Sequence, residues 1–292
     1  MTPVLALVGP TAAGKTEAAI TVAERFGAVV VSADAMQVYR GMDIGTGKAT
    51  LEERARVPHF AIDVRNPDEA FDAADFVALA DEVRRSHERV IVAGGTTLYV
   101  RAFLRGLVET PAVDPELRAR LASLPDPHRA LSEIDAALAA RIDPRDKVRV
   151  VRGLEVHAQT GRALSELHEE HAAQPDRWPS VVRWLDRADL DARIDRRVVE
   201  MRERGFAAEV RVLLDAGYGH DLKPMRSLGY RHLCDHFLDG LDLDEAFRRT
   251  ARDTRRLARK QRTWMRGLGL APPEGADLLQ VALRAAEQAF AR

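Results

Sequence analysis

The segment GPTAAGKT, residues 9–16, constrains the fold of this 292-residue chain more than any other stretch. It matches G-x-x-x-x-G-K-T, the glycine-rich loop whose backbone N–H groups cradle phosphate oxygens. An apolar run at residues 3–9 precedes it, and KTEAAITVAERF at 15–26 follows with helical spacing of its apolar residues. A strand, a loop of this kind and a helix N-terminus in this order predict a phosphate-binding site at the edge of a sheet.

Strands and helices continue to alternate over the first 105 residues. AVVVSAD at 28–34 predicts a second buried strand, the segment 72–88 predicts a helix, and VIVAGGT at 90–96 predicts a third strand. Such alternation is typical of a parallel sheet with helices on both faces. We therefore expect an α/β fold: a P-loop parallel sheet with flanking helices plus a helical insertion domain.

The insertion is indicated by a change of pattern near Thr110. ETPAVDPEL carries two prolines and begins a helical, charge-rich stretch that lasts to about residue 179, where VVRWLDR predicts a return to the sheet. We expect residues 1–109 and 180–292 to form the P-loop core with C-terminal helices. Residues 110–179 would form the helical insertion domain.

Composition excludes several classes of protein. The formal net charge is −1 and hydrophobic residues make up 46% of the chain, which is typical of a globular protein. The single cysteine, Cys234, excludes an intrachain disulfide framework and a cysteine-based zinc site. No apolar run approaches the roughly 18 residues of a membrane span, and no signal segment precedes the first strand. We expect a cytoplasmic, monomeric protein with no zinc and no membrane partner.

Polar residues follow the predicted strands where open α/β sheets bind ligands. Asp34 ends the second strand, and Thr96 follows a Gly-Gly pair after the third. The loop lysine, Lys15, would reach the outer phosphate oxygens, and the Thr16 hydroxyl would hold Mg²⁺. An acid at position 34 could serve Mg²⁺ or act as a general base. The third strand lacks the terminal acid that usually supports Mg²⁺ in an NTPase, and a plain tight turn explains GGTTLY equally well.

A predicted helix near the C-terminus carries an unusual excess of positive charge. Nine basic residues and one acid, Asp253, lie between residues 246 and 266. Solvated helix faces normally mix the two signs, so this composition predicts a polyanionic partner, either nucleic acid or a diphosphate. Six arginines fall on one face: Arg248, Arg252, Arg255, Arg259, Arg262 and Arg266. The pairs Arg149/Arg152 and Arg226/Arg231 provide further basic segments that could track a nucleic-acid backbone.

Together these segments resemble the tRNA dimethylallyltransferase family, also called tRNA isopentenyltransferases. The resemblance covers nearly the whole chain and rests on GPTAAGKT, SADAMQVYRGMDIGTGK (32–48), PHFAIDV (58–64), GGTTLY (94–99), RVVRGLEV (149–156), TG (160–161), RIDRRVVEMRERGFAAEV (193–210), RSLGYR (226–231) and TRRLARKQRTW (254–264). It implies transfer of a dimethylallyl group from dimethylallyl diphosphate to N6 of the adenosine 3′ of the anticodon, position 37, in tRNAs that read codons beginning with U. Mg²⁺ would be the cofactor and the tRNA anticodon stem-loop the macromolecular partner.

The resemblance also implies roles for individual residues. Asp34 would accept a proton from the adenine amine, and Thr96 would orient that amine. The diphosphate would contact Gly9, Pro10, Thr11, Ala12, Ala13, Gly14, Lys15, Thr16 and Arg255. The tRNA would contact Asp34, Ala35, Met36, Gln37, Thr96, Arg118, Val148, Arg149, Val150, Val151, Arg152, Arg226, Ser227, Leu228, Gly229, Tyr230 and Arg231. Ala35 replaces a serine that is usual in the family, which removes one hydroxyl contact.

Three other interpretations stay open on the sequence. An isopentenyltransferase acting on free adenine nucleotide is disfavoured by the separate arginine segments, which a mononucleotide does not need. An ATP-dependent small-molecule kinase is disfavoured by the missing acid after the third strand. A non-catalytic RNA-binding module would leave the intact phosphate loop and Asp34 unexplained.

Overall fold

The computed structural model describes residues 1–272 and 277–291. It divides into two compact units, Met1–Leu104 with Arg177–Arg292, and Arg105–Asp176. The smaller unit begins and ends slightly before the expected 110–179. The reason is that the backbone N–H of Arg177 donates to the Leu104 carbonyl at 2.7 Å, which joins the outgoing and returning chain inside the larger unit.

The larger unit contains a five-stranded sheet in the order β3-β2-β4-β1-β5. The strands are β1 Val4–Val8, β2 Val29–Ser32, β3 His59–Phe60, β4 Val90–Gly94 and β5 Ser180–Trp184. All neighbouring pairs are parallel, which confirms the expected fold class. The strand β3 was not expected, because two residues are too few to produce an apolar pattern. The order sets β4 between β1 and β2, so the segments that follow these three strands are neighbours.

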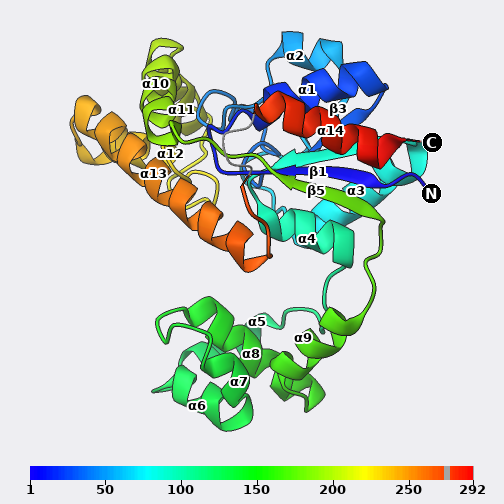
Figure 1. Ribbon diagram of the computed structural model, residues 1–292. Helices are drawn as coiled ribbons and strands as arrows, with labels where there is room; N and C mark the ends of the chain where they lie inside the picture. The colour runs from blue at the N-terminus through cyan, green and yellow to red at the C-terminus, as the bar shows by residue number, and fades with distance from the viewer. Residues whose placement is uncertain (273–276, 292) are drawn as a thin grey trace. The chain divides into compact units, whose positions relative to one another are not determined.

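Helices cover both faces of this sheet (Figure 1). The helices of the larger unit are α1 Lys15–Phe26, α2 Leu51–Arg56, α3 Ala73–Ser86, α4 Thr97–Arg105, α10 Leu190–Glu203, α11 Phe206–Asp215, α12 Tyr230–Asp239, α13 Leu243–Gly267 and α14 Leu278–Phe290. Helices α1 and α14 lie on one face and α3 and α4 on the other, while α10–α13 gather beyond the carboxyl ends of the strands (Figure 1). The expected helices at 15–26 and 72–88 correspond to α1 and α3.

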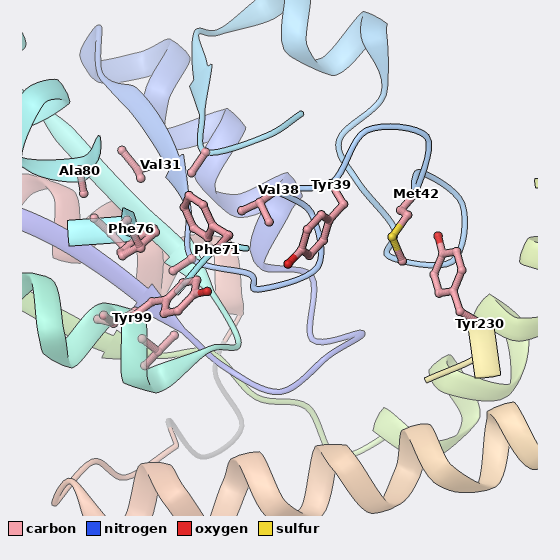
Figure 2. Packing of buried hydrophobic residues seen from close by; sticks show 14 of the residues in the cluster. Val31, Val38, Tyr39, Met42, Phe71, Phe76, Ala80, Tyr99 and Tyr230 are labelled. Atoms are coloured by element: carbon pink, nitrogen blue, oxygen red, sulfur yellow. The ribbon is translucent and has the colours of Figure 1, made fainter. Parts of the chain in front are cut away.

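The core follows the alternation of side chains along each strand. In β1, Leu5 and Leu7 join the cluster under α1 and α14, whereas Ala6 joins the cluster on the opposite face. On that opposite face the rings of Phe76 and Tyr99 stack with centroids 4.7 Å apart (Figure 2). Apolar packing on both faces fixes the strands, and hence the positions of the loops that follow them.

The smaller unit is helical, as expected. Its helices are α5 Pro115–Ala122, α6 Pro127–Ile134, α7 Ala136–Ala139, α8 Lys147–Thr160 and α9 Leu164–Ala173. Gly153 of α8 lets the helix approach its neighbours, because a Cβ there would lie 2.7 Å from Leu131 and 2.8 Å from Leu138. Across residues 1–272 and 277–291, no helix has the length and hydropathy to cross a membrane.

Candidate active site

A pocket of about 400 Å³ opens at the carboxyl ends of β1, β2 and β4. This volume lies within the ordinary range for small-molecule sites. The phosphate loop and α1, the segment after β2, and the Gly-Gly pair after β4 line it together with α10 and α13. Contributing residues include Thr11, Lys15, Thr16, Asp34, Gln37, Gly95, Arg193, Arg197 and Gln261.

Lys15 folds back over the phosphate loop. Its Nζ donates to the Pro10 carbonyl at 2.7 Å. Burial lowers the pKa of Lys15 to about 8, and the nearby Asp34 carboxylate opposes that shift. Within the loop, Ala12 has φ +63° and Gly14 has φ +93°. A left-handed conformation is costly for alanine, so the loop is held in a shape that only surrounding contacts sustain.

The loop presents fewer free amides than the sequence predicted. The Thr11 N–H donates to Gln261 Oε1 at 2.9 Å, and the Ala13 N–H donates to the Pro10 carbonyl at 3.3 Å. These two N–H groups are therefore already used within the protein. In the described part of the chain, no hydrogen-bond acceptor is found for four others: the N–H groups of Ala12, Gly14, Lys15 and Thr16. These four suit an anionic ligand at the helix N-terminus.

Asp34 and Thr96 come together because β2 and β4 pair. Asp34 Oδ1 accepts from the Met36 N–H at 2.9 Å, which closes a turn directly after the strand. Thr96 Oγ1 accepts from the Ala35 N–H at 3.1 Å, and the Thr96 N–H donates to the Ala33 carbonyl at 3.0 Å. The two segments thus form one hydrogen-bonded unit. Both residues are half-buried, and Asp34 lines the pocket whereas Thr96 does not.

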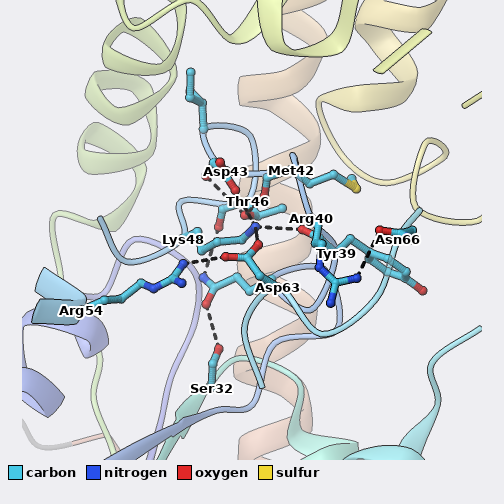
Figure 3. Close-up of polar contacts among 12 residues, drawn as sticks. Ser32, Tyr39, Arg40, Met42, Asp43, Thr46, Lys48, Arg54, Asp63 and Asn66 are labelled. Carbon is cyan, nitrogen blue, oxygen red and sulfur yellow. Dashed lines mark hydrogen bonds and ion pairs between the residues drawn. The ribbon is translucent and has the colours of Figure 1, made fainter. Parts of the chain in front are cut away.

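Gln37 takes part in internal hydrogen bonds. Its Oε1 accepts from Ser32 Oγ at 2.8 Å, and its Nε2 donates to the carbonyls of Thr46 and Gly47 at 3.4 and 3.3 Å (Figure 3). We expected Gln37 to contact the tRNA. It lines the pocket, but both of its polar atoms already hold the 46–47 loop against the end of β2.

A buried lysine anchors the same loop. Lys48 is 6% exposed, and its Nζ donates to the Tyr39 carbonyl at 2.8 Å and to the carboxylates of Asp43 and Asp63 at 2.5 and 2.6 Å (Figure 3). Arg54 also donates to Asp63, at 2.6 Å. Because Lys48 and Arg54 both donate to Asp63, the pKa of that carboxyl is lowered even though partial burial opposes the shift.

Glu209 of α11 fixes residues 43–45 through their backbone. Its carboxylate accepts from the N–H groups of Asp43, Ile44 and Gly45 at 3.0, 2.7 and 3.2 Å. It also accepts from the Tyr230 hydroxyl at 2.5 Å. Tyr230 is 0% exposed, and burial beside this carboxylate raises its pKa. The Tyr230 side chain therefore packs in the core and supports the loop, and contact of this residue with tRNA stays a prediction.

The basic residues of the pocket come from α10. Arg193 Nε donates to the Ala12 carbonyl at 3.0 Å, and Arg197 Nη2 donates to the Thr46 carbonyl at 3.2 Å. Burial lowers the pKa of Arg197. No binding role was predicted for Arg193 and Arg197 from the sequence, although their i, i+4 spacing puts them on one helix face. Arg255, the arginine that was predicted to contact the diphosphate, forms an ion pair with Asp195 and is absent from the pocket wall.

The arginines of α13 do not form one free basic face. Arg248 pairs with Glu245, Arg252 with Asp253, and Arg262 with Asp186. With Arg255, four of the six are neutralised by carboxylates that lie nearby in the fold, some of them far away in sequence. The other two, Arg259 and Arg266, have no ion pair with any residue that the structure describes. Of the six arginines that the sequence placed on one polyanion-binding face, only these two therefore carry a charge that no carboxylate pairs with.

In the smaller unit, two predicted tRNA contacts converge on a buried carboxylate. Glu155 is 0% exposed and accepts from Arg118 at 2.8 Å and from Arg152 at 2.6 Å. Val150 and Val151 are 1% and 4% exposed, so their side chains pack in the core, and contact of these two residues with tRNA stays a prediction. In the segment 148–152, only the first two residues are exposed to solvent: Val148 is 76% exposed, and Arg149 is also exposed.

The segment 226–231 presents arginines around a buried centre. Arg226 and Arg231 are exposed, and Arg231 donates to Asp253 at 2.6 Å. Gly229 has φ +83°, and a Cβ there would lie 2.8 Å from the Phe206 ring. The remaining members, Ser227 and Leu228, are half-buried.

Magnesium ligands of the usual kind are available beside the loop. Among the described residues no group of three or more His, Cys, Asp or Glu side chains could hold a metal alone. Mg²⁺ is commonly bound through one or two protein oxygens plus substrate phosphates and water. The exposed hydroxyl of Thr16 lines the pocket, has no partner in the described structure and fits that requirement.

Comparisons with known proteins agree on one family. A family model described as IPP transferase matches residues 37–268. The tRNA dimethylallyltransferase 1 of Citrifermentans bemidjiense is 46% identical over 270 residues, 89% of this chain and 88% of that protein. The tRNA dimethylallyltransferase of Anaeromyxobacter dehalogenans is 45% identical over 289 residues, 94% and 96% of the two chains.

Two solved structures extend the similarity to the fold. The tRNA isopentenylpyrophosphate transferase of Bacillus halodurans is 33% identical with a TM-score of 0.68, over 99% of this chain and 95% of that one. A eukaryotic dimethylallyltransferase described as acting on tRNA is 25% identical with a TM-score of 0.79, over 91% and 70%.

Proposed function

This chain belongs to the tRNA dimethylallyltransferase family, and from that premise we propose how its pocket carries out the reaction. The protein is a prenyltransferase that moves a dimethylallyl group from dimethylallyl diphosphate to an adenosine of tRNA. We assign the acceptor atom as N6 of the adenosine at position 37, 3′ of the anticodon, in tRNAs that read UNN codons. The product is N6-dimethylallyladenosine, and diphosphate is released.

One observation carries this assignment. The free amides of the phosphate loop and the Asp34 carboxylate open into the same pocket, at the ends of the paired strands β1, β4 and β2. Thr96 does not line this pocket, but its hydroxyl accepts from the Ala35 N–H next to Asp34. A diphosphate held by the loop and an amine held by Asp34 would then approach one another across the pocket. A phosphate loop by itself would suit ATP equally well, whereas a carboxylate that faces it suits an amine nucleophile.

The chemical step needs a base because the adenine amine is a weak nucleophile. Its N6 lone pair forms the new bond to C1 of the dimethylallyl group. The C1–O bond breaks, and its electron pair leaves on the diphosphate. The N6 proton passes to the Asp34 carboxylate, whose Oδ1 is already fixed by the Met36 N–H. Thr96 is the second polar contact that orients the amine, since its hydroxyl is held by the Ala35 N–H.

Negative charge grows on the leaving diphosphate during this step. The loop amides, Lys15 and the α10 arginines Arg193 and Arg197 stabilise that charge. Thr16 would hold Mg²⁺, which would supply further neutralisation of this charge. The lowered pKa of Lys15 in the ligand-free protein is reversed when a diphosphate arrives, because an added anion favours the protonated amine.

The acceptor base must leave its stack to reach the pocket. Asp34 and Gln37 line the pocket. The exposed residues Val148, Arg149, Arg226 and Arg231 provide candidate contacts to the RNA. Free nucleotide would use none of these contacts, which favours RNA as the acceptor.

A substrate-swap assay tests the proposal. The protein is incubated with Mg²⁺, labelled dimethylallyl diphosphate and either a tRNA anticodon stem-loop or AMP. We expect label on the stem-loop only. Label on AMP alone would indicate the nucleotide enzyme. No transfer to either acceptor, with ATP consumed instead, would contradict the prenyltransferase assignment. A stem-loop with guanosine at position 37 is the matched control and should accept no label.

A further inference from the structure

One side chain joins the phosphate loop to the Gly-Gly segment after β4. Gln261 of α13 is 9% exposed; its Oε1 accepts from the Thr11 N–H at 2.9 Å and its Nε2 donates to the Gly95 carbonyl at 3.1 Å. Thr11 lies on the side of the pocket that would hold the leaving group. Gly95 immediately precedes Thr96, on the side that would hold the amine. The catalytic step described above does not use Gln261.

The orientation of the Gln261 amide is set by its partners. The Thr11 N–H can only donate and the Gly95 carbonyl can only accept. The reverse orientation would place the amide NH₂ against the Thr11 N–H and the amide oxygen against the Gly95 carbonyl, and neither pair could form a hydrogen bond. Gly95 also leaves the room that this contact needs, because a Cβ there would lie 2.4 Å from Nε2. Both sides of the contact are therefore shaped around a glutamine amide.

The backbone that carries Gln261 is itself fixed to the loop. Arg262 forms a two-pronged pair with Asp186, at 2.8 and 2.7 Å. One turn before Gln261, Ala258 is 1% exposed and packs in a cluster with Ala13 of the phosphate loop. Movement of α13 would thus be transmitted to the loop through packing and through the Gln261 amide together.

We propose that Gln261 is a positioning residue that sets the separation between the bound diphosphate and the acceptor amine. This inference rests on the proposed function. Gln261 contacts neither reacting atom. It ties the loop that holds the leaving group to the segment that holds Thr96, so that the two substrates meet at reacting distance. Loss of such alignment lowers turnover more than it lowers affinity, since each substrate keeps its own binding contacts.

Gln261→Met tests the proposal with nearly unchanged side-chain length. Displacement of reacting groups by about 1 Å can cost roughly 10²-fold in rate. We expect kcat to fall by about 30- to 100-fold, while KM for dimethylallyl diphosphate and for the stem-loop changes by less than about threefold. Hydrogen exchange of the peptide containing residues 9–14 should speed up in the ligand-free protein, because the Thr11 N–H loses its acceptor.

Gln261→Glu provides a second variant with a pH readout. Its carboxylate would still accept from the Thr11 N–H but would repel the Gly95 carbonyl. Protonation of the glutamate carboxylate restores an O–H donor for the Gly95 carbonyl. The kcat of this variant relative to wild type should therefore rise as the pH is lowered. Gln280→Glu on the exposed face of α14 is the matched control and should show neither effect.

Several results would overturn the inference. They are a Gln261→Met protein that is folded and turns over within about threefold of wild type, a rise in KM with kcat unchanged, or unchanged exchange at residues 9–14. A wild-type protein that transfers no prenyl group would contradict the proposed function instead. The exchange measurement would still test the tether in that case, because it needs no substrate.

Discussion

Asp34 offers a substitution that separates chemistry from loop structure. Asp34 Oδ1 accepts from the Met36 N–H at 2.9 Å, and asparagine retains an oxygen that can make the same bond. Asp34→Asn should therefore keep the turn after β2 and the contact of the Ala35 N–H with Thr96. It removes the proton acceptor, which is worth about 10²–10⁴-fold in rate for a positioned base. The expected rise in the activation barrier is about 3–5 kcal/mol.

Asp34→Ala should lower the rate at least as much and should also lose the turn. One neutral hydrogen bond contributes about 1 kcal/mol to the free energy of unfolding, and this cost should separate the two variants in a urea titration. Single-turnover transfer of labelled prenyl group to the stem-loop measures the rate, and fluorescence anisotropy measures stem-loop binding. Asp68→Asn, on an exposed loop, is the control for loss of one carboxylate. Turnover of Asp34→Asn within about threefold of wild type would refute the assignment of the base.

Three further predictions follow from the electrostatics. Lys15 has a pKa lowered from 10.5 to about 8, so the unfolded state binds more protons between these values, and the free energy of unfolding should rise from pH 8 to pH 10. Lys15→Met should reduce that rise in urea titrations; parallel curves would contradict the pKa shift. Arg197→Met should raise KM for dimethylallyl diphosphate by about 10- to 100-fold, from loss of a charge-assisted contact. Arg255→Met should have a smaller effect because Asp195 already pairs with it, and equal effects in steady-state kinetics would reject this ranking. Glu155→Ala should lower the free energy of unfolding by about 3 kcal/mol because it leaves Arg118 and Arg152 without their buried partner, whereas Glu133→Ala, at an exposed pair, should cost under about 0.5 kcal/mol. Thermal unfolding that shifts equally for these two glutamates would show that burial does not govern their contributions.

The site residues that local sequence patterns predict lie close to strand ends. The loop at 9–16, Asp34 and Thr96 each follow a buried apolar run, and parallel pairing brings such positions to one edge of a sheet. The meeting of the loop and Asp34 in one pocket is therefore predictable from local patterns. The helical insertion was also visible, because its prolines and charge density differ from those of the sheet region.

The supporting contacts could not be predicted in the same way. Glu209 holds residues 43–45 from a helix more than 160 residues away in sequence, and Gln261 reaches Thr11 across 250 residues. Both lie in segments that carry the family resemblance, but the spacing of residues along a helix does not show which distant backbone group each one contacts. The arginines of α13 led to the opposite error: local spacing suggested a free basic face, but carboxylates such as Asp186 and Asp195 reach them from other segments.

Residues at the strand ends and residues that support them from distant helices have different roles in the site. The phosphate loop carries its own recognition of oxygens, since the helix N-terminus and free amides need only adjacent residues. Its distance from Asp34 and Thr96 depends on strand order and on α13, which supplies the Gln261 bridge. A phosphate loop transplanted without that bridge would still bind a diphosphate. It would not hold the attached carbon at reacting distance from an amine, and it is this tertiary property that makes the loop of this chain part of a prenyl-transfer site.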